Sequence, residues 1–487
     1  MPTSAFDDLA DQLARSLTAA DAGVWADFDE NVRAALRWGS PVPAAPIRFP
    51  GAPGRRPALV ETAVALCGPD GRTREAALSR AGGLPELLPL VVVRCSDWAG
   101  PVRERARSVL RAELPGLSPG AFGGLLAVAL RIAGRLRGDA ARDLLVGVLR
   151  EGPGGRVTAL LGSGDRAVRR LAHRIAVERG LLSPARLAEI AAADPDAVVQ
   201  DLCANAVLAA VGDPADGALL DPLLRSRQGR VRAAGVTGLR RTGRAAGAEP
   251  FLYDRSALVR ACARWVLRQA DTDPLPLYRT VCADGAGVPD DAPLGLAECG
   301  DRAVDVPVLW TLTGHGRPRV RASAVGGLRR LDAVRVDPLV PLLDDGSARV
   351  VREAVAALLP WADRLPADGL LRRATGAPAP HVRRGALRLL AEAGGTPFRE
   401  AARALADDPD PKVRDRARRA GAQAPSFAGG RGHKRLLSQG SRQGIAPGRG
   451  AEQNVGHGKD IRTYRRTAAR LHRGAAGLLH RDRSPDR

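Results

Sequence analysis

The chain has 487 residues, of which 45% are hydrophobic and 26% are charged, and its formal net charge is +21. This length is sufficient for a buried core. No uninterrupted apolar run reaches about 18 residues, and no charged segment followed by an apolar one opens the sequence, so membrane spanning and secretion are not predicted and we expect a cytoplasmic protein without a membrane partner.

The excess positive charge is spread unevenly and consists almost wholly of arginine. Of the 74 basic residues only three are lysines, and Ala, Gly and Pro are abundant while aromatic residues make up 3% of the chain. This composition is typical of GC-rich, bacterial-type coding, which weakens the inference from net charge to nucleic acid. Residues 421–487 hold 14 Lys and Arg against 4 Asp and Glu, so about half of the excess charge lies in them.

Residues 1–57 are predicted to form a separate N-terminal part. Ser4–Leu17 and Ala22–Trp38 each place apolar residues on one face of a helix, and Gly39–Pro57 is too rich in Pro and Gly for regular structure. The two helices are expected either to cap the end of a larger helical array or to form a partner-binding hairpin on a flexible linker.

A Val-Arg pair then recurs along most of the chain, and its last three steps are each 31 residues long. Small or apolar residues follow each Val after four, seven and eight positions, which predicts a helix with one buried stripe. An Asp or Ser often stands three residues before the Val and is predicted to cap that helix. A period of this size indicates a solenoid. The pairs are Val102-Arg103, Val168-Arg169, Val231-Arg232, Val259-Arg260, Val320-Arg321, Val351-Arg352, Val382-Arg383 and Val413-Arg414, with Val199-Gln200 as a degenerate copy.

Two stretches depart from the repeat. Ala121–Arg150 is apolar and helical but lacks the Val-Arg pair, and Pro274–Leu312 is interrupted by Gly285-Ala286-Gly287 and a Pro/Asp cluster. The second stretch is the place where we expect a bend or a binding insertion.

The pattern Asp-x-x-Val-Arg-x-x-Ala-x-x-x-Leu, followed by a second helix, resembles the HEAT and HEAT-like repeat family. The resemblance covers residues 58–420 and implies an all-α solenoid, a right-handed superhelix of antiparallel helix pairs. It also implies that the repeated Arg bonds an acidic or carbonyl group in a neighbouring unit; an anion-binding stripe is the alternative. We call these eight residues the Arg ladder: Arg103, Arg169, Arg232, Arg260, Arg321, Arg352, Arg383 and Arg414.

Sequence motifs for catalysis, cofactors and metals are missing from the chain. No glycine-rich segment matches a phosphate-binding motif, and His173, His315 and His381 do not form a metal-ligand spacing. The six cysteines stand singly without any C-x-x-C and are predicted to be buried thiols. No catalytic, cofactor or metal-binding residue is therefore assigned, and no cofactor is expected.

Residues 421–487 lack apolar periodicity up to Tyr464 and are predicted to be disordered. Their charge suits an electrostatic tether to nucleic acid or to an acidic protein. Translation of GC-rich DNA without a selected sequence is the other explanation for such a segment.

Two functions remain. The first is a non-enzymatic scaffold that holds an extended or acidic protein partner on the concave surface of the solenoid. The second rests on resemblance to the HEAT-like DNA glycosylases, which use Trp, Asp and Arg side chains in a cationic groove. The chain has six tryptophans and many arginines, but no such constellation can be placed on its residues.

Overall fold

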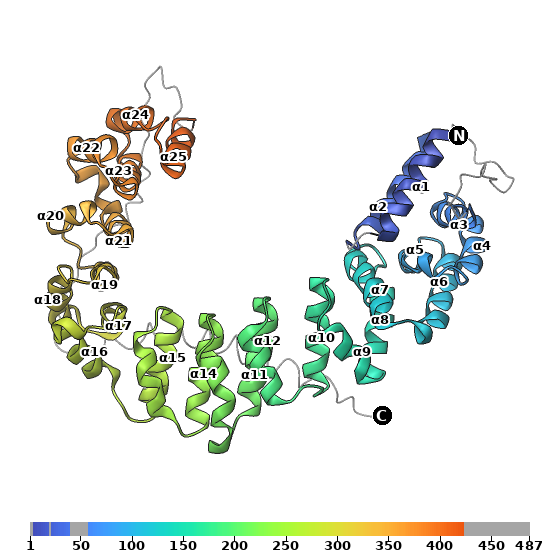
Figure 1. The fold of residues 1–487 in the computed structure, drawn as a ribbon, viewed down its shortest axis with the longest axis horizontal. Coiled ribbons are helices and arrows are strands. Elements are labelled where there is room, and N and C mark those ends of the chain that lie inside the picture. The colour runs from blue at the N-terminus through green and yellow to red at the C-terminus, as the bar shows by residue number, and fades with distance from the viewer. Residues whose placement is uncertain (1–2, 19–20, 39–56, 423–487) are drawn as a thin grey trace, which may run out of the picture. The chain divides into compact units, whose positions relative to one another are not determined.

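The computed structural model describes residues 3–18, 21–38 and 57–422, so the predicted linker and the basic segment lie outside the described residues, apart from the ends that α3 and α25 include. These residues form α-helices and short 3-10 helices, with no strand among them (Figure 1). The predicted all-α solenoid is confirmed. None of the helices within the described ranges is long and apolar enough to cross a membrane.

The chain divides into two compact units, Met1–Val207 and Leu208–Arg487. The helices of the first unit are α1 (Thr3–Thr18), α2 (Val24–Trp38), α3 (Pro57–Cys67), α4 (Gly71–Ala81), η1 (Pro85–Leu87), α5 (Leu88–Arg94), α6 (Gly100–Glu113), η2 (Leu114–Gly116), α7 (Pro119–Ile132), α8 (Asp139–Glu151), α9 (Gly154–Leu160), α10 (Arg166–Glu178), α11 (Pro184–Ala193) and α12 (Ala197–Ala210).

The helices of the second unit are η3 (Pro214–Leu220), α13 (Asp221–Leu224), α14 (Gly229–Arg241), η4 (Ala245–Tyr253), α15 (Ala257–Arg268), α16 (Pro274–Ala283), η5 (Gly285–Gly287), α17 (Ala292–Cys299), α18 (Arg302–Leu312), α19 (Pro318–Arg330), α20 (Val336–Leu339), η6 (Val340–Asp344), α21 (Ala348–Leu358), η7 (Leu359–Arg364), α22 (Ala367–Gly376), α23 (Pro380–Ala393), α24 (Gly395–Ala404) and α25 (Pro411–Ala422).

The helices pack in pairs, and we name the first of each pair the A helix and the second the B helix. In the second unit the contacting pairs include α13 with α14, η4 with α15, α16 with α17, α18 with α19, α22 with α23 and α24 with α25. The B helices are α4, α6, α10 and α12 in the first unit and α14, α15, α17, α19, α21, α23 and α25 in the second. All of them except α4 and α17 carry the repeated Val near their start.

The B helix α10 shows why the repeated pattern is helical. Asp165 accepts bonds from the N–H groups of Ala167 and Val168, each at 2.9 Å, and so caps the helix. Val168 and Ile175, seven residues apart, are both fully buried. Asp70 and Asp410 cap α4 and α25 in the same way, whereas Ser256, a predicted cap, makes no such bond.

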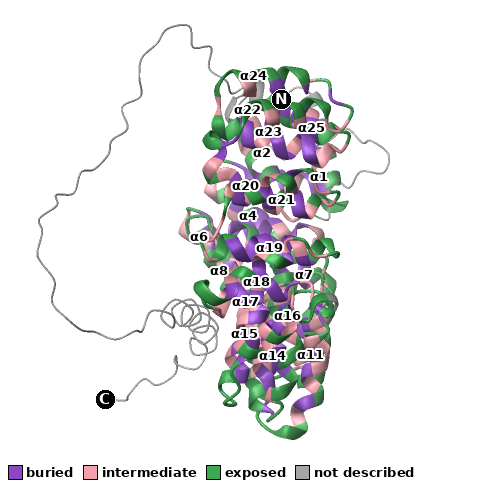
Figure 2. Cartoon of the chain, turned by 90° about the vertical axis from the view of Figure 1, so that its left-hand side faces the viewer, coloured by how far each residue is buried: buried purple, intermediate pink, exposed green. Residues whose placement is uncertain are grey.

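The N-terminal helices share the core of the first unit. Leu9 and Leu13 of α1 and Phe28 and Val32 of α2 belong to the same buried cluster as the core residues of α3 and α5. Figure 2 shows buried and exposed residues alternating along the helices. α2 contacts α3, α5 and α7. These four residues of the predicted apolar faces are therefore covered, whereas Leu17, at the end of the face predicted for α1, is exposed.

The stretch that interrupts the repeat still forms helix pairs. Pro274–Leu312 contains α16, α17 and α18, and Tyr278 of α16 is buried with its hydroxyl donating to the carbonyl of Leu252 at 2.7 Å. Tyr278 packs so closely on α17 that a Cβ at Gly295 would lie 2.1 Å from its ring. The glycine at 295 thus permits the contact between these two helices.

Candidate interaction surface

The repeated Arg of the B helices bonds the turn that precedes its own helix. In Arg383, Nη1 donates to the carbonyls of Ala377 at 2.9 Å and Pro378 at 2.8 Å. In seven other B helices an Arg likewise bonds the carbonyl six residues before it, and this satisfies a backbone acceptor in each of these turns. The acceptors are Gly68 for Arg74, Asp97 for Arg103, Ser163 for Arg169, Ser226 for Arg232, Asp254 for Arg260, His315 for Arg321 and Asp408 for Arg414.

The other edge of the guanidinium reaches a carboxylate one repeat later. Arg383 donates from Nε to Oδ2 of Asp408 at 2.8 Å and from Nη2 to Oδ1 at 2.9 Å. Such a two-bond pairing fixes both distance and orientation. The same pairing joins Arg74 to Asp97, Arg232 to Asp254 and Arg321 to Asp345.

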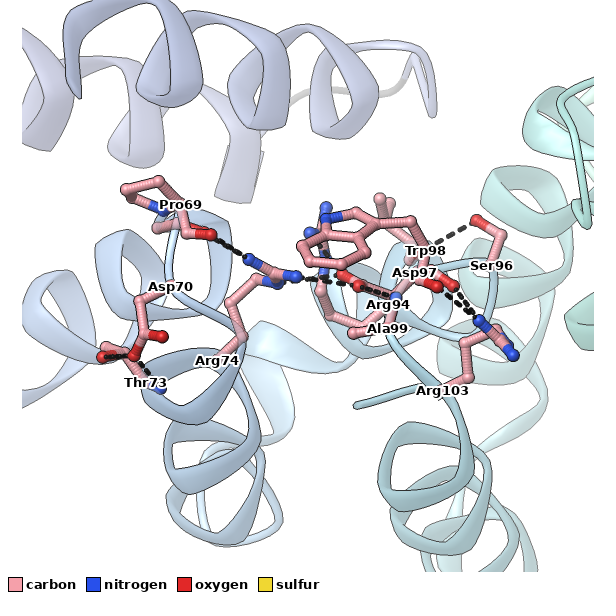
Figure 3. Close-up of polar contacts among 12 residues, drawn as sticks. Pro69, Asp70, Thr73, Arg74, Arg94, Ser96, Asp97, Trp98, Ala99 and Arg103 are labelled. Atoms are coloured by element: carbon pink, nitrogen blue, oxygen red, sulfur yellow. Dashed lines mark hydrogen bonds and ion pairs between the residues drawn. The ribbon is translucent and has the colours of Figure 1, made fainter. Parts of the chain in front are cut away.

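Each of these aspartates also holds its own turn, because its carboxylate accepts the N–H two residues later. Asp408 accepts from Asp410 at 2.8 Å and Asp97 accepts from Ala99 at 3.0 Å. The bonds from Arg383 lower the pKa of Asp408 below its ordinary range. Burial alone would raise the pKa of Asp97, but the bonds from Arg74 and Ala99 hold it below that range (Figure 3).

Other ladder residues take different acidic partners or none. Arg260 pairs with Glu298 of α17, 38 residues later, and Arg264 donates to the same carboxylate at 2.6 Å. Arg169 lies 3.9 Å from Asp196, whose closest guanidinium is that of Arg170. The hydrogen bonds described for Arg103 and Arg414 go to backbone carbonyls alone.

Arg352 does not occupy the ladder position, contrary to the sequence expectation. Arg352 is exposed, and its Nε lies 4.0 Å from the nearest described carboxylate oxygen, Oε1 of Glu353. The buried Val of this helix that matches Val382 is Val350, five residues after Asp345, so Val351 stands where other repeats have Arg. Because Val350 and Val351 are adjacent, the alignment of the repeats by sequence was wrong by one residue in this helix.

The aspartate that would pair with an Arg at position 351 is also missing. Ala377 stands five residues before Val382, where Asp345 and Asp408 stand in the repeats on either side. Val351 belongs to the buried core and Ala377 packs against it. The carbonyl of Asp345, which a ladder Arg would bond, accepts instead from Nε2 of His381 at 3.1 Å.

A buried ionic network joins α2 to the first repeats. Arg94, at the end of α5, is 1% exposed and lies between two carboxylates, those of Asp29 on α2 and Asp97. Burial opposes its charge, but Asp29 and the neighbouring Asp97 raise the pKa of Arg94 overall. Neither Asp29 nor Arg94 stands out in the sequence, because the signal is a contact between distant segments.

An apolar groove of about 640 Å³ lies in the first unit between α1, α2, α5, α7 and α9. Its polar side chains include Ser16, which donates to the carbonyl of Gln12, and Ser163 and Asp165, which cap local backbone N–H groups. The side chains of Ser16, Ser163 and Asp165 are therefore already hydrogen-bonded to the backbone of nearby helix ends. The rest of the groove is lined by Leu, Ala, Val, Pro and Trp side chains, by glycines and by Glu86.

The tryptophans do not form the constellation of the glycosylase resemblance within the described residues. Trp98 is 64% exposed and stands next to Asp97, with the Arg74 guanidinium 5.4 Å from its ring centre (Figure 3). Asp97, however, is fully covered and accepts bonds from two arginines and a backbone N–H. Its carboxylate cannot contact a substrate. Trp25 is buried, and Trp265, Trp310 and Trp361 each lie against an arginine.

Groups of His, Cys, Asp and Glu that could hold a metal ion are absent from the described part of the chain. None of the six cysteines forms a disulfide, and all are buried except Cys299, which is half-buried. Burial raises the pKa of Cys95, Cys203 and Cys282 to about 12, which disfavours their thiolates.

Comparison with known proteins gives structural neighbours alone. No family model and no curated protein matches the chain. An engineered protein is 19% identical, with a TM-score of 0.23, over 73% of this chain and 96% of its own. Kap121p bound to RanGTP is 14% identical (TM-score 0.27; 74% of this chain, 48% of that one), and Kap121p by itself is 12% identical (TM-score 0.25; 86% and 51%). The chain thus spans about half the length of Kap121p.

Proposed function

We propose that this chain is a non-enzymatic scaffold that binds a protein partner along its row of B helices. The observation that carries the proposal is the continuity of this row in the second unit. α14 packs on α15, and α17, α19, α21, α23 and α25 pack each on the next, while Arg264 joins α15 to α17. Because neighbouring helix axes lie 8–10 Å apart, such a row suits an extended partner segment.

The Arg ladder supports this proposal because its bonds are internal. Apart from that of Arg352, its guanidiniums bond groups in their own repeat or in the next one, so they hold neighbouring helices in register and leave specificity to other positions. The residue two places after the repeated Val is alanine in α14, α15 and α19 and charged in the three later B helices. The charged residues are Arg352, Arg384 and Asp415.

The proposal is tested by cross-linking the full chain in lysate of its native host, after nuclease treatment and at moderate salt. We expect recovered proteins whose cross-links fall on B helices. If a parallel sample without nuclease treatment yields nucleic acid and no protein, the proposal is contradicted. Cross-links confined to A helices would contradict it as well. We expect the cytoplasm to be the compartment in which the partner is found.

We propose nucleic acid binding for the basic segment, residues 421–487, because it holds about half of the excess positive charge of the chain. Deletion of residues 423–487 is expected to remove affinity for duplex DNA and to leave protein binding unchanged. If duplex affinity survives the deletion, the repair-protein alternative gains support over the scaffold.

A further inference from the structure

Arginines without acidic partners gather on two neighbouring B helices of the second unit. Arg384 and Arg388 lie one turn apart on α23, and α23 packs on α25, which carries Arg416 and Arg419 (Figure 1). Within the described residues Arg384, Arg388 and Arg416 have no hydrogen bond or ion pair, and Arg419 bonds only the carbonyl of Asp415, at 3.1 Å. We call these four residues the α23–α25 arginine cluster.

The like charges of this cluster act on one another. Partial burial and then the charges of Arg388, Arg384 and Arg419 lower the pKa of Arg416. Arg383, the neighbour of Arg384 in sequence, is by contrast buried and paired with Asp408. The cluster is therefore distinct from the Arg ladder. Arg416 and Arg419 are exposed and Arg384 and Arg388 are half-buried, so solvent reaches all four residues.

We propose that the α23–α25 arginine cluster is the site at which the scaffold holds an acidic, extended segment of its protein partner. This inference rests on the proposed function. Guanidinium groups pair with carboxylates through two parallel bonds, and such pairs would remove the repulsion within the cluster. Two helix axes are 8–10 Å apart and an extended residue spans about 3.3 Å, so about three extended residues bridge the two helix axes.

The surroundings favour a peptide over a nucleic acid. Glu392 lies on α23, Asp415 on α25 and Glu353 on α21, so these helices carry charges of both signs, whereas binding of a polyphosphate chain is favoured by positive charge along its length. The sequences of α21, α23 and α25 contain no Phe, Tyr or Trp on which single-stranded bases could stack. Discrete carboxylates match this discrete cluster.

The test uses the full chain and an eight-residue peptide with four Glu and a photo-reactive group, beside a peptide with Gln in place of Glu. We expect the acidic peptide to cross-link to α23 and α25 and the Gln peptide not to do so. The variant R384S/R388S is expected to weaken peptide binding at this site about tenfold. The matched control is R372S/R403S, which removes two exposed arginines from the A helices of the same repeats and is expected to change nothing.

A second variant separates binding from folding. Arg416→Ser removes a charge that its neighbours repel, so it should leave the unfolding midpoint unchanged or higher while it weakens peptide binding. A parallel loss of binding and stability would overturn the proposal.

Cross-links confined to residues 423–487 or to other B helices would overturn this site and leave the scaffold standing. A short DNA duplex that displaces the peptide from α23 and α25 more effectively than a second acidic peptide does would assign the cluster to nucleic acid instead.

Discussion

Arg383 and Asp408 lie 25 residues apart in sequence and meet through two parallel hydrogen bonds of 2.8 and 2.9 Å. The two side chains are 10% and 3% exposed. Since Arg383 also bonds the turn before its own helix and Asp408 the turn before the next, one ion pair connects two turns and two B helices. The repeat is thus linked along the chain by a polar contact as well as by its apolar core.

Loss of this contact should destabilise the second unit. Arg383→Ala leaves the Asp408 carboxylate buried without a cation and two turn carbonyls without a donor, so we expect about 2 kcal/mol of lost unfolding free energy in urea. Arg352→Ala is the matched control, because Arg352 also follows a Val but is exposed. Its expected effect is below about 0.5 kcal/mol. Equal losses in the two variants would show that the ladder contact has no special weight.

The fold could be predicted because helix periodicity and a repeat length are local signals. The stripe at Val259, Ala263, Val266 and Leu267 is buried as its spacing predicts. The register of α21 could not be read this way, because Val350 and Val351 are both apolar and both buried. The aspartate five residues before the repeated Val would have settled the register, since Asp345 points to Val350.

The contacts that join distant segments were beyond sequence reasoning. Arg94 and Asp29 meet because α2 packs on α5. Glu298 of α17, the helix that follows the interruption, takes the place of an aspartate beside Arg260. A single charged residue has no periodicity, so its partner can be identified only from the packing of the helices. For the same reason the sequence could not predict that Arg384, Arg388 and Arg416 have no acidic partner within the described residues.

Acid should weaken the fold in a defined pH range. A carboxyl with a pKa lowered in the folded state, such as Asp408 beside Arg383, stabilises the fold above its unfolded pKa, about 3.9, and loses this contribution as pH falls through the folded pKa. We therefore expect the melting temperature to stay level from pH 7 to about pH 5 and to fall steeply below about pH 4. Asp408→Asn should flatten that fall, whereas Asp415→Asn, an exposed position on α25, should keep the parent slope.

Thiol labelling should report opening of the repeats. Because burial raises the pKa of Cys95, Cys203 and Cys282 to about 12 and also raises that of Cys262, iodoacetamide at pH 8 is expected to modify them only when the surrounding helices open. Cys299, which is half-buried, should react first. Mass spectrometry of timed samples gives the order; rapid modification of Cys203 without denaturant would contradict the buried position.

The exchange of an ionic contact for an apolar one between α21 and α23 can be reversed by design. Val351→Arg alone places a guanidinium against Ala377, and Ala377→Asp alone places a carboxylate against Val351, so each single variant should lose about 2–3 kcal/mol. The double variant should recover most of that loss, because the new pair repeats the geometry of Arg383 and Asp408. A double-mutant cycle in urea is expected to give a coupling of about 2 kcal/mol. Additive losses would contradict the assignment of Val351 to the ladder position.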